Sequence, residues 1–102
     1  MFKNRHFTCG VQSTIPPEII SFIWCLIDDL LESAHDVDYL QIFSLWEDTD
    51  STGESIQMVS HTQEKPQYKA VYSLFLSHPP INAKIFVIDD VSHSTMLLAN
   101  EY

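Results

Sequence analysis

The stretch TIPPEIISFIWCLIDDLLESAHD, residues 14–36, holds the clearest regular element of the chain and decides the fold. Pro16 and Pro17 open it, and a helix accepts proline in its first turn because the N–H groups there lack intrahelical partners. Glu18 follows in that turn, where the helix dipole favours negative charge. The stretch therefore predicts one long helix.

The predicted helix is apolar over a wide arc. At about 100° per residue, its polar side chains collect in a narrow arc and leave about 200° apolar, whereas about 100° suffices for one packing surface. The narrow arc contains Glu18, Ser21, Cys25, Asp28, Asp29 and Glu32. We expect the helix either to be deeply cradled or to meet a partner along one flank, formed by Ile20, Trp24 and Leu31.

Beyond residue 38 the pattern changes from helix to strand. Aromatic and branched residues dominate five stretches, at residues 39–47, 56–61, 68–76, 84–89 and 95–99. A short first strand is expected in HFTCGV, residues 6–11, ended by Gly10. Consecutive strands with short connections are mostly antiparallel. Residues 1–102 are therefore predicted to form one α+β domain, in the order β-α-β-β-β-β-β. Its curved, mainly antiparallel sheet of five to six strands would pack on the one long helix.

Several predicted strands are apolar on both sides. Examples are SLFL at residues 73–76, IFVI at 85–88 and MLLA at 96–99. One helix cannot cover both faces of an open sheet. Either the sheet curls into a half-barrel, or a second chain covers the bare face, and a homodimer is the first guess for that second chain.

The charge of the chain restricts its partners. In 102 residues, 14 Asp and Glu stand against 5 Lys and Arg, which gives a formal net charge of −9. A surface this acidic repels phosphate backbones and anionic lipid headgroups, so direct binding to nucleic acid or membranes is disfavoured. A protein partner remains compatible, including one that itself binds nucleic acid through a basic groove.

The cysteines and the apolar segments indicate a cytoplasmic location. Cys9 and Cys25 are expected to be free thiols, because a chain with this hydrophobic content needs no disulfide. The N-terminus has no apolar stretch of signal-peptide length. The longest apolar segment, residues 19–31, is interrupted by Asp28 and Asp29 and is too short to span a bilayer.

The C-terminal stretch KIFVIDDVSHSTMLLANEY, residues 84–102, contains the densest cluster of reactive residue types. Asp89, Asp90 and His93 suggest a metal-assisted hydrolase, which would need further ligands such as His61 or His78. No two histidines of the chain stand at a metal-ligand spacing. We therefore assign no metal and no cofactor.

The same stretch also allows a serine hydrolase, with His93 as base and Ser92 or Ser94 as nucleophile. Neighbouring residues of a strand point to opposite faces, so His93 and Ser94 are expected to diverge. Asp and Ser side chains bond neighbouring amides in turns, and this segment links two apolar strands. DDVSHS is therefore interpreted as a structural turn, with no catalytic residue in the chain.

Four stretches resemble a known family: residues 10–28, 38–45, 60–68 and 81–102. They are similar to small Firmicute and phage-associated proteins that are grouped as the domain of unknown function nine-sixty. The proline-entered helix and the ending IFVIDD…HSTMLLA.EY are the most specific parts. The resemblance implies a bacterial, cytoplasmic origin, on a mobile element, and it supplies no catalytic residue.

The function predicted from the sequence is that of a non-enzymatic protein-binding or regulatory module. One alternative is a phage or mobile-element inhibitor that presents its acidic surface to a basic host protein. The other is the metal-assisted hydrolase described above.

Overall fold

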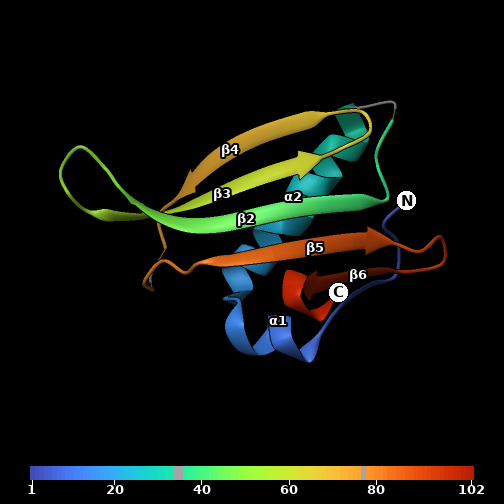
Figure 1. Cartoon of the computed structure of the whole chain (residues 1–102), viewed down its shortest axis with the longest axis horizontal. Coiled ribbons are helices and arrows are strands. Elements are labelled where there is room, and N and C mark those ends of the chain that lie inside the picture. Colours follow the sequence, from blue (N-terminus) through green and yellow to red (C-terminus); the bar gives the residue numbers. More distant parts are fainter. Residues whose placement is uncertain (34–35, 77) are drawn as a thin grey trace.

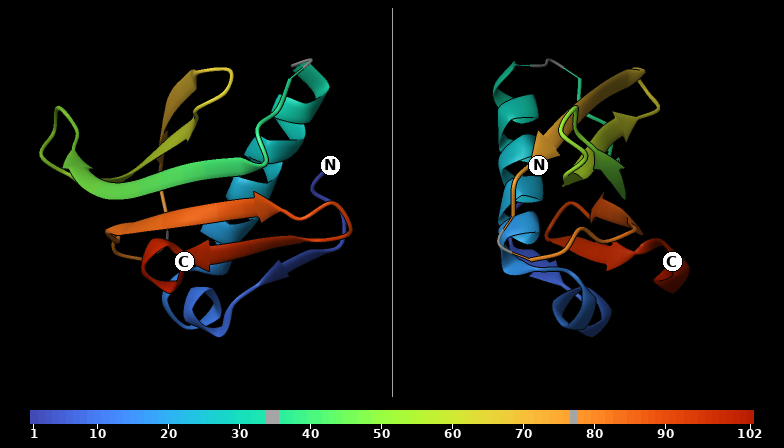
Figure 2. Two further views of the ribbon diagram at one scale, coloured as in Figure 1. Left: turned by 45° about the vertical axis from the view of Figure 1, so that its right-hand side comes forward. Right: turned by 90° about the vertical axis from the view of Figure 1, so that its left-hand side faces the viewer.

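The predicted helix is present as α2, Pro17–Ser33, which packs on one face of a six-stranded sheet (Figure 1). The computed structural model describes residues 1–33, 36–76 and 78–102, so the expected continuation of the helix through residues 34 and 35 lies outside the described residues. Figure 2 shows α2 on one side of the sheet and the C-terminus on the other.

The sheet is open and mixed. Its strands are β1 (Arg5–Phe7), β2 (Leu40–Thr49), β3 (Ser55–Gln63), β4 (Tyr68–Leu74), β5 (Ala83–Asp89) and β6 (Ser94–Leu98). In space they lie in the order β1-β6-β5-β2-β3-β4. β1 runs parallel to β6, and the other neighbours are antiparallel. The predicted α+β class and the mainly antiparallel sheet are confirmed, and the sheet does not close into a barrel.

The prediction of a single helix is wrong on the N-terminal side of α2. Residues Cys9–Thr14, which were assigned in part to a strand ended by Gly10, form a separate helix, α1. Thr8 begins α1 because its hydroxyl oxygen accepts the Val11 N–H at 3.2 Å. Ile15 then takes an extended conformation, which separates α1 from α2. A short 3-10 helix, η1 (Ala99–Glu101), follows β6.

The core lies between α2 and the inner face of the sheet. The side of α2 that faces the sheet buries Ile19, Ile23, Leu26, Ile27 and Leu30. Alternate residues of the central strands meet them, namely Phe43, Leu45, Val59, Ile85, Val87 and Met96. The expected polar arc of α2 is exposed at each of its positions. The sheet therefore has one face covered by α2 and one outer face on the opposite side.

The outer face carries an apolar patch of its own. Strand register places Leu97 opposite Phe86 and Phe86 opposite Ile42, and it places Ile88 opposite Leu40 in the next row. These five side chains are half-buried. The C-terminal Tyr102 ring meets Phe86 edge-on, with 5.5 Å between the ring centroids. We call Leu40, Ile42, Phe86, Ile88 and Leu97 the outer patch.

Candidate functional site

The DDVSHS segment is the turn that joins β5 to β6. β5 ends at Asp89 and β6 begins at Ser94, and the Asp90 N–H donates to the His93 carbonyl at 2.8 Å. Val91 at the tip has φ of +59° and is almost fully exposed. The segment therefore has the strand-turn-strand form that the sequence predicts.

The turn brings together three side chains from the two hydrolase hypotheses, namely Asp90, Ser92 and His93. The Ser92 hydroxyl lies 3.2 Å from Nδ1 of His93, and a carboxylate oxygen of Asp90 lies 3.6 Å from Nε2. Ser94 points away, is buried, and donates to the Lys3 carbonyl at 3.1 Å. His93 and Ser94 diverge as expected, whereas Ser92 and His93 do meet.

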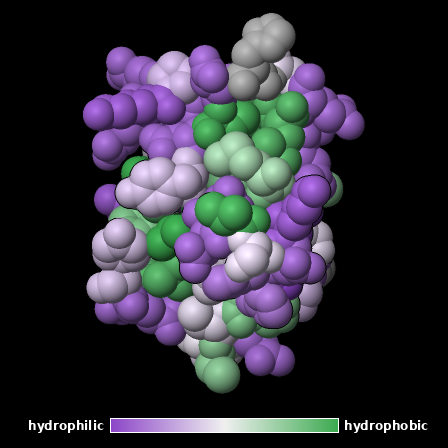
Figure 3. Space-filling view, turned by 90° about the vertical axis from the view of Figure 1, so that its right-hand side faces the viewer, coloured by the Kyte–Doolittle hydropathy of each residue, from purple (hydrophilic) through white to green (hydrophobic). Residues whose placement is uncertain are grey.

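This chain of contacts lies on an exposed turn. An exposed ion pair contributes little, and an acyl-transfer nucleophile also needs donors aimed at the developing oxyanion. Figure 3 shows this end of the molecule, where apolar side chains lie among polar ones. For the metal-assisted hydrolase, the described residues contain no group of three metal-ligating side chains that could hold a metal ion together.

The polar groups of the turn bind the N-terminal segment instead. Asp89 accepts the Phe2 N–H at 3.1 Å, and the Ser92 carbonyl accepts the Asn4 side-chain amide at 2.7 Å. The Ser94 N–H donates to the Asn4 carbonyl at 3.2 Å. These contacts hold the segment before β1 against β6.

Replacing Val91 by asparagine is expected to raise the free energy of unfolding by about 1 kcal/mol. Val91 is a β-branched residue held at positive φ, where asparagine is tolerated far better. Urea denaturation of the purified variant measures the change. Val91→Ile keeps the strain and serves as the control, so equal effects of the two substitutions would contradict the prediction.

A buried polar chain under α2 was not foreseen from the sequence. Nε2 of His61 lies 2.6 Å from Oε1 of Gln41, and the Gln41 amide donates to Oε1 of Gln63 at 2.8 Å and to the Asp38 carbonyl at 2.9 Å. Because that amide nitrogen already donates, Oε1 of Gln41 is the acceptor and Nε2 of His61 carries the proton. The alternate polar positions of β3, Gln57, His61 and Gln63, were the available signal.

The rest of His61 is packed in the core. Its ring stacks on Phe43 with 4.4 Å between centroids and meets Tyr68 edge-on at 5.4 Å. Nδ1 has no hydrogen-bond partner within the described ranges. Burial lowers the pKa of His61 from 6.5 to about 4. The neutral ring is therefore the form that the fold holds, which suits a structural role.

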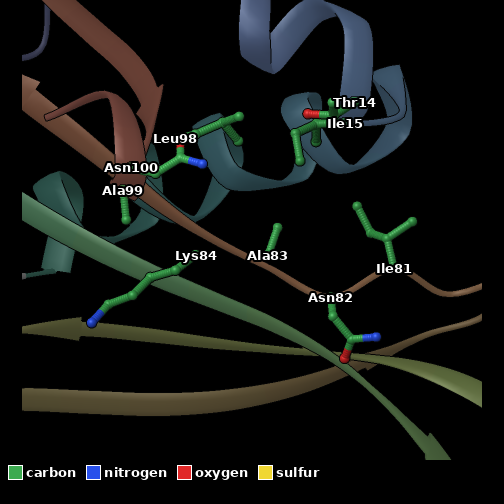
Figure 4. A pocket seen from close by; sticks show the side chains of 9 residues that line it. All are labelled: Thr14, Ile15, Ile81, Asn82, Ala83, Lys84, Leu98, Ala99 and Asn100. Carbon is green, nitrogen blue, oxygen red and sulfur yellow. The ribbon is translucent and has the colours of Figure 1, made fainter.

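An open groove of about 480 Å³ lies between α1, the start of β5 and η1 (Figure 4). Thr14 lines one side, and Asn82 and Asn100 add amide groups along it. The ammonium group of Lys84 points away from the groove in Figure 4. The groove thus offers neutral polar groups along its walls and no charge aimed into it from this lysine.

The predicted interface flank on α2 is half-buried. Ile20, Trp24 and Leu31 all pack against the core cluster. The Arg5 guanidinium lies 4.7 Å from the Trp24 ring centroid and pairs with Asp28. An interface on this flank stays a prediction.

The two edges of the sheet differ strongly. β1 has three residues, two of them Arg5 and His6, whereas β4 has seven and is followed directly by Phe75. Beside the β4 edge, Val71 is 49% exposed and Phe75 is 79% exposed. No other described strand pairs with the outer edge of β4, so this edge combines unpaired backbone groups with exposed apolar side chains.

Both cysteines are free and exposed. Within the described ranges, none of the helices is long and apolar enough to cross a membrane.

Comparison with known proteins places the chain in a family. The family model described as staphylococcal protein of unknown function (DUF960) matches residues 4–101. A solved structure of a protein of unknown function from Enterococcus faecalis is similar, with a TM-score of 0.72 and 27% identity over 97% of this chain and 90% of that chain. No curated protein matches. The resemblance seen in the sequence is confirmed, and the chain belongs to the DUF960 family of staphylococcal proteins of unknown function.

Proposed function

We propose that this chain is a cytoplasmic, non-enzymatic protein-binding module that binds its partner along the open β4 edge. The observation that supports this most strongly is the exposure of Val71 and Phe75 beside an unpaired edge strand. An edge strand presents a row of unpaired N–H and C=O groups, and adding a strand there satisfies them. The apolar side chains beside the edge then supply contact area.

Natural sheets protect their edges with lysine, proline, bulges or very short strands. β1 follows that rule through its short length and its polar residues. β4 has seven residues and a single charged side chain, Lys69. The difference between the edges favours a role for β4 in contact with a partner.

The outer patch supports a binding role independently. Among the described residues no α-helix covers this face, and the C-terminal segment reaches it through the contact of Tyr102 with Phe86. An apolar surface left in water is unfavourable by about 25 cal/mol per Å². The patch lies on β2, β5 and β6, and β3 separates it from β4, so a partner bound at β4 would have to extend across β3 to cover it.

The alternatives have weaker support. The Ser92, His93 and Asp90 contacts lie on an exposed turn beside groups that bind the N-terminal segment. An inhibitor that uses its acidic surface would draw on carboxylates of two regions, the polar arc of α2 and the β2–β3 hairpin, and on α2 Asp28 is already paired with Arg5. A phage or mobile-element origin is compatible with the binding role.

The double variant Val71→Lys, Phe75→Asp is expected to fold normally. In quantitative affinity capture from a lysate of the native host, it is expected to retain at least tenfold less partner protein than the wild type. Both side chains are exposed, so the substitutions leave the core intact. Val91→Asp is the matched control, because it places a charge on an exposed valine at the β5–β6 turn. The proposal is wrong if the wild type and the double variant retain the same proteins in the same amounts.

A further inference from the structure

Resting on the proposed role of β4, we infer that the strand added at this edge is β4 of a second copy of the chain. The two strands pair antiparallel about a two-fold axis, and Ser73 lies on that axis. The product is a homodimer with one continuous sheet across both copies, which is the closed, isologous arrangement that most self-associating proteins use.

The pattern of exposed side chains selects this register. Phe75 directly follows Leu74, the last residue of β4. Pairing about Ser73 extends the strand by this one residue and places Val71 opposite Phe75 of the second copy, and by symmetry this contact occurs twice. Directly opposed residues of an antiparallel pair have their side chains on the same face, so the two exposed apolar groups meet. Tyr72 comes to lie opposite Leu74 of the second copy, on the inner face.

Neighbouring registers leave apolar groups without apolar partners. Pairing about Tyr72 places Val71 opposite Ser73 and Lys69 opposite Phe75 of the second copy. Pairing about Val71 places Phe75 opposite the polar Gln67, and both residues lie just outside β4. Of these three registers, only the one centred on Ser73 brings the exposed valine and phenylalanine together.

The charges of the edge are compatible with a second copy. Residues 68–76 contain no carboxylate, and their one charged residue is Lys69. In the Ser73 register the two Lys69 residues are eight positions apart along the paired strands, about 27 Å at about 3.4 Å per residue. The net charge of −9 on each copy opposes association only at longer range. Added salt screens that repulsion, so the dimer is expected to tighten as the ionic strength rises.

A disulfide at residue 73 tests the register directly. In a Cys9→Ser, Cys25→Ser background, Ser73→Cys is expected to form a covalent dimer rapidly under air and copper–phenanthroline. Directly opposed residues have Cα atoms about 4.5–5.5 Å apart, which lies inside the range that a disulfide spans. Lys69→Cys in the same background is the matched control and is expected to stay monomeric on a non-reducing gel.

Sedimentation of the unmodified chain completes the test. The wild type is expected to sediment as a dimer and the Val71→Lys, Phe75→Asp variant as a monomer. Equal cross-linking of the two cysteine variants overturns the inference. So does a dimer that survives the double variant but is lost in Leu31→Asp, since that result places the interface on the α2 flank.

The outcomes separate this inference from the proposed function. A monomeric wild type whose capture of another protein is abolished by the double variant refutes the homodimer and leaves the β4 binding role intact. A monomeric wild type that captures nothing sensitive to the double variant refutes both.

Discussion

Lowering the pH from 7 to about 4 is expected to remove about 3 kcal/mol from the free energy of unfolding, through His61. The side chain is 1% exposed, and burial lowers its pKa from 6.5 to about 4. A tenfold difference in proton affinity corresponds to about 1.4 kcal/mol, which gives the figure of about 3 kcal/mol.

The direction follows from which state binds the proton. Above pH 6.5 the histidine is neutral in both states, and its full contribution to stability is present. As the pH falls below 6.5, His61 becomes protonated in the unfolded chain but stays neutral in the folded chain. The free energy of unfolding therefore decreases progressively until about pH 4. The proton would have to sit on Nδ1, which has no hydrogen-bond acceptor among the described residues.

Urea denaturation across this pH range measures the effect, with His61→Gln as the matched control. Glutamine keeps a donor toward Gln41 and does not titrate, so the variant should show a nearly flat profile between pH 6.5 and 4. The hydrogen bond between Asp28 and Arg5 keeps the pKa of Asp28 below 3.8. Protonation of this carboxylate therefore changes the free energy of unfolding only at lower pH. Parallel losses in the wild type and in His61→Gln would show that other groups are responsible.

The helix was predictable because its pattern is local. Two prolines, a first-turn Glu18 and a compact polar arc define α2 without any knowledge of the sheet. The hairpin of β2 and β3 has a local pattern too, since a turn that contains Gly53 separates the two strands. Elements whose signals lie within a short window of sequence are the ones that sequence analysis can place.

The elements that depend on distant contacts were missed or left open. The expected first strand is present only as β1, and α1 replaces its second half because Thr8 caps the helix. The Thr8 hydroxyl also donates to Glu101 at 2.7 Å, from the other end of the chain. The pairing of β2 with β5 and of β1 with β6 leaves no local mark in the sequence. Whether the sheet curls or a second chain covers its bare face could not be decided from the sequence, and the strand order adds that the sheet is open with β4 at one edge.

The candidate site shows the same division. The turn at DDVSHS followed from the residues between two apolar strands, whereas the contact of Ser92 with His93 depended on the conformation of the tip. The buried hydrogen-bonded side chains from His61 to Asp38 come from two strands and a loop, so no single stretch of sequence predicts their contacts. Strand alternation could have placed His61 inward, but only the register brings Gln41 to it.

The N-terminal Phe2 is expected to be among the most costly single residues to truncate. Phe2→Ala should lower the free energy of unfolding by about 3–5 kcal/mol, because a buried phenylalanine loses its packing and leaves a cavity. The Phe2 side chain is 1% exposed and belongs to the core cluster, although the sequence around it, MFKNR, is mostly polar. Its φ of +55° is unfavourable for a bulky residue, and the surrounding contacts hold it there.

Phe7→Ala is the matched control, since the same side chain is 46% exposed in β1 and its truncation should cost about 1 kcal/mol. Urea denaturation of both variants gives the comparison, and equal losses would show that Phe2 is not packed as the structure has it. A large loss at Phe2 alone would tie the N-terminal segment to the β5–β6 turn energetically. Asp89 accepts the Phe2 N–H. Its carboxylate, which suggested a metal site in the sequence, would then have a structural role in holding the N-terminal segment.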